Sequence, residues 1–212
     1  MAYAFVARLL VPLAWWGRVR VSGEDLVPAT GPALVVPNHD SQMDPVVLGI
    51  ALRRRRRLRF LARANLWRIQ GLGPVLSAMS QIPIERGSGD VAALDSAVAA
   101  LRDGEAVCIF PEGRLSRGRR LRAHSGVARL HAAHPEATVV LCAIQGTTDY
   151  ARFPRRPRVL IEFFAPDPAA DSAGALLAAI RERVPPVSAG RHRRPVDPAE
   201  DVARGADYAD RA

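Results

Sequence analysis

Short apolar runs alternate with helical patterns along most of this chain. Strands are expected at 33–36, 58–62, 82–84, 106–110, 139–144 and 158–164, with a weak edge strand at 18–21. Helices are expected at 45–52, 65–69, 74–79, 91–102, 126–133 and 172–184. Strands that alternate with helices favour an α/β class. We therefore predict a single α/β domain, in which a mixed, mostly parallel sheet is flanked by helices.

The chain divides into three segments by composition. Residues 1–17 are mostly apolar, 18–184 carry the strand and helix patterns, and 185–212 are rich in Pro, Arg, Asp and Ala without periodicity. The central segment is long enough to bury a substantial core. The last segment lacks the apolar content that ordering requires, so we expect a disordered tail.

The first segment is expected to form a helix at the membrane interface. Residues 1–16 are apolar except for Arg8, but a membrane-spanning helix needs about 20 residues. A basic leader region and a small-residue cleavage site are missing, so a signal peptide is not indicated. Trp15 and Trp16 beside Arg18 suit a helix lying in the interface. The alternative is a first helix that packs on the domain's own core.

The chain is strongly basic, which predicts anionic partners. The formal net charge is +9, and every basic residue is Arg. Such a balance suits nucleic acid, phosphorylated small molecules or an anionic bilayer. Aromatic residues make up only 6% and are not interleaved with basic patches, which argues against nucleic acid. Five consecutive arginines at 53–57 are either a solvated helix end or a contact for anionic lipid headgroups.

Two cysteines, Cys108 and Cys142, both lie in apolar runs. This usage indicates neither a disulfide framework nor a paired metal site, so a reducing compartment and no bound metal are expected. Both cysteines are interpreted as small buried residues.

One imidazole and one carboxylate follow the apolar run at 33–36. His39 and Asp44 are five residues apart, so they can meet only if the segment 40–42 forms a turn. In contact, the carboxylate would orient the imidazole as a general base. No nucleophilic side chain is associated with the pair, which would then activate a hydroxyl or water directly. The alternative is that Asp44 only caps the following helix.

Two further stretches carry candidate phosphate ligands. After the strand at 106–110, the sequence continues Pro111-Glu112-Gly113-Arg114, with Arg117 nearby. Backbone N–H groups near Gly113 and the two arginines could hold a phosphate. Arg86 ends the short apolar strand at 82–84 and could reach into a cleft. Taken singly, each of these stretches is equally compatible with a solvated surface.

Together these stretches resemble the glycerolipid acyltransferase family that includes 1-acylglycerol-3-phosphate acyltransferases. That family carries Asn-His-x-x-x-x-Asp, then a short apolar stretch ending in Arg, then Phe-Pro-Glu-Gly, then an apolar strand. The matching segments here, within residues 20–164, are 38–44, 81–86, 110–113 and 139–144, and 126–129 resembles the helix that follows the third block.

The resemblance implies an O-acyltransferase of phospholipid biosynthesis that makes phosphatidic acid from lysophosphatidic acid. His39, oriented by Asp44, would deprotonate the acceptor's hydroxyl, which attacks an acyl thioester without a covalent enzyme intermediate. Arg86, Glu112 and Gly113, with Arg114 or Arg117, would position the glycerol phosphate. The donor would be acyl-CoA or acyl carrier protein, with no cofactor. The location would be peripheral, on the cytoplasmic face of the cell membrane.

The sequence departs from the family pattern next to the third block. Many members continue Phe-Pro-Glu-Gly with Thr-Arg-Ser, whereas here Arg114-Leu115-Ser116 follow. Cys142 and the pair Met79-Ser80 also stand where Pro and Gly are frequent. Another lysophospholipid or polar lipid acceptor is therefore an alternative. A thioester hydrolase and a non-catalytic basic membrane-binding domain are further alternatives.

Overall fold

The computed structural model describes all residues except 1, 86–89, 117–118, 153–155, 171 and 185–212. Its α-helices are α1 (Ala2–Trp16), α2 (Asp44–Ala51), α3 (Leu72–Ala78), α4 (Val91–Arg102), α5 (Gly126–Ala133) and α6 (Ala173–Arg183). Its strands are β1 (Arg20–Ser22), β2 (Ala33–Pro37), β3 (Arg59–Arg63), β4 (Ile82–Ile84), β5 (Ala106–Cys108), β6 (Thr138–Gln145) and β7 (Leu160–Phe164). Short 3-10 helices are η1 (Glu24–Leu26), η2 (Ala64–Arg68) and η3 (Thr147–Arg152).

The described strands form one seven-stranded sheet in the order β1-β7-β6-β2-β5-β3-β4. The strand β2 lies at its centre and pairs in parallel with β6 and β5, so that Val35 stands opposite Val140 and Cys108. Within this sheet only the β6–β7 pair is antiparallel. The predicted single α/β domain with a mixed, mostly parallel sheet is therefore confirmed.

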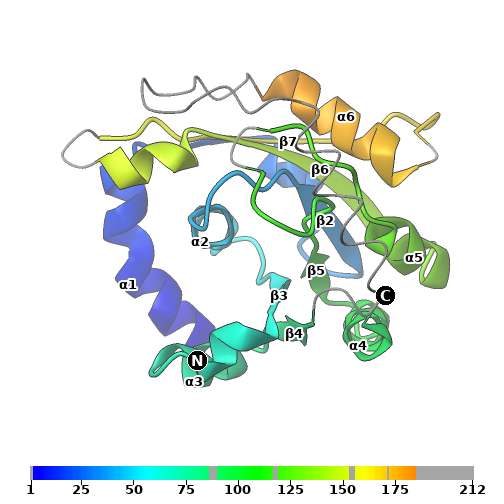
Figure 1. The fold of residues 1–212 in the computed structure, drawn as a ribbon, viewed down its shortest axis with the longest axis horizontal. Helices are drawn as coiled ribbons and strands as arrows, with labels where there is room; N and C mark the ends of the chain where they lie inside the picture. The colour runs from blue at the N-terminus through cyan, green and yellow to red at the C-terminus, as the bar shows by residue number, and fades with distance from the viewer. Residues whose placement is uncertain (1, 86–89, 117–118, 153–155, 171, 185–212) are drawn as a thin grey trace, which may run out of the picture.

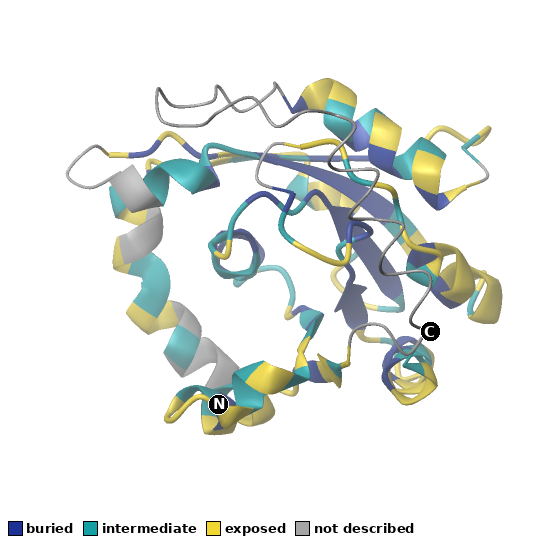
Figure 2. Ribbon diagram, in the orientation of Figure 1, coloured by how far each residue is buried: buried dark blue, intermediate teal, exposed yellow. Residues whose placement is uncertain are grey.

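Two apolar cores lie on the two faces of the sheet. Leu34 and Val36 of β2 face the layer formed by α4, α5 and α6, whereas Val35 faces α2. This alternation follows from the two-residue repeat of a strand. Figure 1 shows α4, α5 and α6 on one side of the sheet and α2 on the other, with α1 outside α2. Figure 2 shows that burial is concentrated along the strands between these layers.

Several sequence-based boundaries shift by a few residues. The helices expected at 91–102 and 126–133 are confirmed at those residues. The strand expected at 106–110 ends earlier, at Cys108. The helix expected at 65–69 is the 3-10 helix η2, and the edge strand expected at 18–21 begins at Arg20. The tail at 185–212 falls outside the described residues.

The helix α1 packs beside α2 and near α3. It nevertheless exposes Leu9 and Trp15 to solvent. Arg156 holds its end, because the guanidinium donates to the carbonyls of Trp15 and Trp16 and lies 4.9 and 5.4 Å from their ring centroids. The helix thus contacts the domain and presents apolar side chains outward. No helix within the described part of the chain has the length and apolar character needed to cross a membrane.

Candidate active site

The two predicted site segments meet at the carboxyl end of the central strands. The segment 38–44 follows β2, and Pro111 to Gly113 follow the neighbouring β5. In open α/β sheets this edge is where ligands bind, because loops from adjacent parallel strands converge there. The parallel sheet therefore brings together residues that are more than 70 positions apart in the chain.

His39 and Asp44 are in contact. The Nδ1 atom of His39 lies 3.1 Å from Oδ2 of Asp44. The same Oδ2 accepts hydrogen bonds of 2.8 Å from the backbone N–H groups of Asp40 and Ser41. The other oxygen, Oδ1, accepts a bond of 2.5 Å from the hydroxyl of Thr147. The turn between the two residues thus brings the imidazole to a fully buried carboxylate.

The alternative interpretation of Asp44 as a simple helix cap does not describe its contacts. The residue before it, Met43, occupies the N-cap position of α2 and makes no side-chain cap bond. Asp44 is the first residue of the helix, and its carboxylate turns back onto the preceding turn. Pro45 follows in the first turn, where its missing N–H group has no cost.

Asn38 ties the same turn to the neighbouring strand β6. Its side-chain amide donates to the carbonyl of Ile144 at 2.9 Å and accepts from the N–H of Ile144 at 2.7 Å. Asn38 is fully buried, so both bonds are made away from water. The side chain of Asn38 thus takes the place of a backbone partner for β6 just beyond the end of β2. This fixes the point at which the turn leaves the sheet.

An aromatic side chain supports the imidazole. The ring of Phe110 stacks on His39 with a centroid distance of 4.0 Å and an interplanar angle of 28°. Phe60 of β3 stacks behind Phe110 at 6.3 Å. The base therefore has a polar partner at Nδ1 and an apolar wall along its ring face.

Glu112 points into the protein. Its carboxylate is only 1% exposed, and Oε2 accepts a 2.9 Å bond from the backbone N–H of His39. Oε1 accepts a 2.9 Å bond from Nε of Arg181. Burial raises the pKa of Glu112, although Arg181 and the His39 N–H oppose that shift. Glu112 thus supports the His39 turn, and direct contact with an acceptor's phosphate stays a prediction.

The other predicted phosphate ligands are only partly described. Gly113 has φ +60, and its α-carbon faces His124, whose Cδ2 would lie 2.8 Å from an added β-carbon. Arg114 is exposed beside it. Arg86 and Arg117 fall outside the described residues, so their predicted roles stay predictions.

Arg181 of α6 is a site residue that the sequence did not indicate, and so is Thr147. The guanidinium of Arg181 donates to Asp40 through Nη1 and Nη2 at 2.9 and 3.0 Å, and it also binds Glu112. In the sequence, Arg181 and Arg183 look like ordinary cations at a helix C-terminus, where the dipole favours them. No local pattern distinguishes Arg181, which is partly buried against the site, from Arg183.

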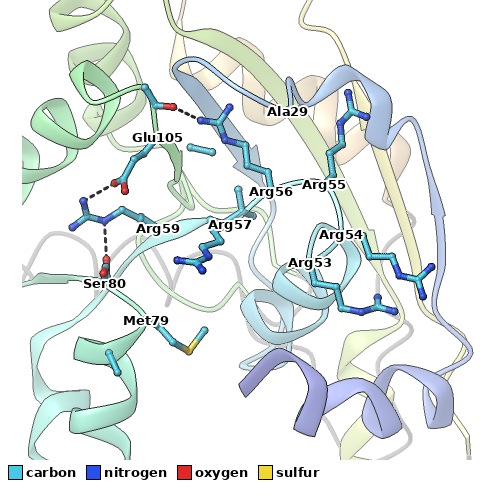
Figure 3. Close-up of a pocket in the computed structure, with 14 residues that line it drawn as sticks. Ala29, Arg53, Arg54, Arg55, Arg56, Arg57, Arg59, Met79, Ser80 and Glu105 are labelled. Carbon is cyan, nitrogen blue, oxygen red and sulfur yellow. Dashed lines mark hydrogen bonds and ion pairs between the residues drawn. The ribbon is translucent and has the colours of Figure 1, made fainter. Parts of the chain in front are cut away.

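The arginine run at 53–57 lies at the opposite end of the strands from His39, beside the amino ends of β3 and β5. It lines a pocket of about 500 Å³ with Arg59 and Ala106, which stand at the amino ends of β3 and β5. Figure 3 shows the arginine side chains spreading in different directions from the turn. This edge is separated from His39 by the length of the strands.

Some of these arginines bind the protein itself. Arg55 donates to the Val27 carbonyl and pairs with Asp25 at 2.9 Å, and Arg56 donates to the carbonyls of Pro28 and Gly104. Burial lowers the pKa of Arg56. The structure thus adds a third role to the two that the sequence left open, because Arg55 and Arg56 clamp neighbouring loops.

Comparison with known proteins identifies relatives of the chain. A family model described as "Acyltransferase" matches residues 18–145. The 1-acyl-sn-glycerol-3-phosphate acyltransferase of Bacillus subtilis is 26% identical over 112 residues, which are 52% of this chain and 56% of that protein. An uncharacterized Mycobacterium leprae protein is 29% identical over 147 residues, which are 63% of this chain and 38% of that protein. The matches thus span less than two thirds of these relatives' length.

A solved structure has the same fold. The crystal structure of the 1-acyl-sn-glycerophosphate acyltransferase from Thermotoga maritima superposes with a TM-score of 0.64 and 21% sequence identity. The match covers 85% of this chain and 74% of that chain. It therefore includes most of the sheet and its helices.

Proposed function

The chain belongs to the acyltransferase family, and we propose that it transfers a fatty acyl group from an acyl thioester to the free hydroxyl of lysophosphatidic acid. The product is phosphatidic acid, and the process is phospholipid biosynthesis. The observation that carries this proposal is the 3.1 Å contact between His39 Nδ1 and the buried carboxylate of Asp44. A general base needs such a partner to fix its tautomer.

The contacts of Asp44 support Nε2 as the imidazole nitrogen that acts as the base. An ionised carboxylate only accepts hydrogen bonds, so Nδ1 of His39 donates to it and Nε2 carries the lone pair. Nε2 takes the proton of the acceptor's hydroxyl while the hydroxyl oxygen attacks the thioester carbonyl. The tetrahedral intermediate then expels the thiolate, which receives the proton from the imidazolium. The acyl group passes directly from sulfur to oxygen, without a bond to the protein.

Preorganisation of the base supports this reaction. The imidazole is held by Asp44 and Phe110, and the main chain of His39 is bonded to Glu112 and Ser116. Holding the base in place lets the bound hydroxyl compete with water, because correct orientation can lower the barrier by several kcal/mol, roughly 7–11 in ideal cases.

Cations near the third sequence block would hold the acceptor's phosphate. Arg114 is exposed next to Gly113, and Arg86 and Arg117 are assigned by resemblance. Ser116, which matches the family's serine, is buried and bound to Arg181. Because Leu115 stands where the family has an arginine, a different lysophospholipid acceptor is the second candidate for the same chemistry.

We place the enzyme at the cytoplasmic face of the cell membrane as a peripheral protein, with residues 1–17 at the interface, 18–184 as the acyltransferase domain and 185–212 as a tail. Support comes from the exposed Leu9 and Trp15 of α1. Apolar and aromatic side chains on one helix, flanked by arginines, are typical of interfacial binding.

The deciding experiment is an acceptor panel with one labelled acyl-CoA, read by mass spectrometry. We expect phosphatidic acid from lysophosphatidic acid, and its loss in His39→Ala. His131→Ala, an exposed histidine of α5, is the control and should keep full activity. Full activity in His39→Ala would reject the general-base role. Thiol release without any lipid acceptor would favour a hydrolase.

A second arm tests the phosphate ligands. Arg86→Ala should raise the apparent KM for the lysophospholipid more than the KM for acyl-CoA. Arg102→Ala, at the end of α4, is the control. Equal effects of Arg86→Ala on both substrates would count against a phosphate role for this residue.

A further inference from the structure

We propose that Arg181 of α6 is a positioning residue for the proposed reaction: it holds Asp40, Glu112 and Ser116 together and so fixes the turn that presents His39. This inference rests on the proposed function, because it concerns the same site. Arg181 lies outside the residues 18–145 that the family model matches.

The guanidinium forms a double fork. Nη1 and Nη2 bind the two oxygens of Asp40 at 2.9 and 3.0 Å, and Nε and Nη2 both bind Oε1 of Glu112. Nη2 also donates to the hydroxyl of Ser116 at 2.9 Å, and that hydroxyl donates to Asp40. The planar, rigid donor set of an arginine suits such bidentate contacts, which a lysine cannot reproduce.

The partners of Arg181 bind the main chain of His39 at both its N–H group and its carbonyl. Glu112 accepts from the N–H of His39 at 2.9 Å, and the N–H of Ser116 donates to the His39 carbonyl at 2.7 Å. Asp40 is the next residue in the chain, and its N–H binds Asp44 at 2.8 Å. The N–H and the carbonyl of His39 are therefore each linked to Arg181 through one intermediate residue.

The charges require this arginine. Asp40 and Glu112 are both buried near the base, and their negative charges repel each other. A buried carboxylate that loses a cation is costly to keep ionised, so removal of Arg181 favours protonation of Glu112 or movement of its side chain. The charged groups facing Glu112 are Arg181 from α6 and Asp40 from the turn after β2, with His39 adjacent. Either response displaces the His39 turn.

A purely structural role would be to fasten α6 to the sheet, but α6 has other attachments. Leu177 and Ile180 are buried in the core. Gln145 donates to the carbonyl of Arg183 at 2.7 Å, and Arg183 pairs with Glu162 at 2.8 Å and lies over the ring of Phe164. The helix therefore keeps its anchorage when Arg181 is replaced.

The test compares Arg181→Met with Arg181→Lys and with Arg183→Met as the matched control on the same helix. We expect Arg181→Met to lower kcat about 100-fold while both KM values change less than about threefold, since a small displacement of a base acts on the chemical step. Arg181→Lys should restore part of kcat because it returns the charge. Arg183→Met should leave kcat unchanged.

Two readouts separate positioning from stability. The acid side of the kcat profile should move to higher pH in Arg181→Met, because Arg181 lowers the pKa of Glu112 and its loss lets that carboxylate protonate earlier. The imidazole NMR resonance of His39, assigned by its absence from His39→Gln, should shift in Arg181→Met and stay in place in Arg183→Met.

The NMR readout needs no turnover. A shifted resonance in a protein without acyl transfer would preserve the inference and reject the proposed function. The inference is overturned if folded Arg181→Met keeps kcat and the resonance, or if Arg183→Met lowers kcat equally. If Arg181→Met does not fold, Arg181→Lys is measured instead. Wild-type kcat and an unmoved His39 resonance in Arg181→Lys would overturn the proposal. A lowered kcat with a moved His39 resonance would support it.

Discussion

The carboxylate of Glu112 accepts a 2.9 Å hydrogen bond from the backbone N–H of His39. This bond joins the loop after β5 to the loop after β2, and it places a buried carboxyl group directly behind the base. Glu112 of the segment 110–113 thus supports the segment 38–44 from inside the protein.

The burial of this carboxyl group predicts how stability depends on pH. Burial raises the folded-state pKa of Glu112, so the folded protein holds this proton more tightly than the unfolded chain. The contribution of Glu112 to stability is complete below about pH 4.3, the pKa of an unperturbed glutamate. It is lost as the pH rises through the folded-state pKa.

Glu112→Gln removes this titration. The free energy of unfolding of the wild type, minus that of the variant, should therefore be larger near pH 4 than near pH 7, as measured by urea denaturation. A difference that grows with rising pH would contradict the direction of the shift.

Asp44→Asn should impair both catalysis and folding. The amide cannot accept as many hydrogen bonds as the carboxylate and no longer stabilises the imidazolium, so kcat should fall roughly 10²–10³-fold. One of the hydrogen-bond donors that now contact the Asp44 carboxylate would face the N–H group of the new amide. This loss should lower the free energy of unfolding by about 1–3 kcal/mol. Asp95→Asn, exposed on α4, is the control and should change neither quantity. An Asp44→Asn enzyme with wild-type kcat would show that the carboxylate does not assist His39.

Thr147 offers a milder perturbation of the same carboxylate. Its hydroxyl donates to Oδ1 of Asp44 at 2.5 Å. Thr147→Val removes that donor with little change of volume, so we expect a loss of about 1–3 kcal/mol in unfolding free energy. We also expect kcat to fall about tenfold, because Asp44 is less firmly oriented. Thr147→Ser keeps the hydroxyl and should keep most of the activity; equal losses in both variants would point to the methyl group instead.

Gly113 should not tolerate a side chain. Its φ of +60 is unfavourable for other residues, and an added β-carbon would meet Cδ2 of His124 at 2.8 Å. Gly31 has φ +80 and no atom within 4 Å of such a β-carbon, so Gly31→Ala measures the backbone term alone, about 1–2 kcal/mol.

Gly113→Ala should cost more than Gly31→Ala in thermal denaturation. The double variant Gly113→Ala/His124→Ala should return to the Gly31→Ala level, since it removes the contact but keeps the backbone strain. Equal costs for the two single variants would mean that His124 moves aside freely.

The interfacial role of α1 can be tested with two exposed apolar residues. Leu9 on α1 is 63% exposed and Val91 on α4 is 58% exposed. If α1 lies on the membrane, Leu9→Asp should weaken sedimentation with anionic vesicles about tenfold or more, because it loses about 1.5–3 kcal/mol of apolar burial. Val91→Asp should bind like the wild type. Equal binding of the two variants would exclude Leu9 from the contact.

Local signals were sufficient for much of the fold. The helix α4 follows Asp90, whose side chain accepts from the N–H of Ala93 at 3.0 Å, and Gly104 lies beyond its end. Both features are readable in the sequence, and the helix forms where they predict it. The sheet class also follows from local patterns, since strands that alternate with helices leave few other arrangements.

The candidate site could be predicted only in part. The contact of His39 with Asp44 needs a turn of five residues, which is a local event. Arg181 and Thr147 reach the same place from more than 100 residues away, and their contacts depend on how β6 and α6 pack. The direction of Glu112 depends on the same packing, so residue type and spacing could not distinguish an inward carboxylate from one that meets phosphate.

The position of Arg181 in chain order has a consequence for how the protein is made. Asp40 and Glu112 leave the ribosome long before α6 does, so their contacts with Arg181 form only after the helix has been synthesised and has docked. Domains fold largely as units during synthesis. The His39 turn should therefore take its final form late, and a chain interrupted before residue 181 would carry the whole sequence signature of the family with an unassembled centre.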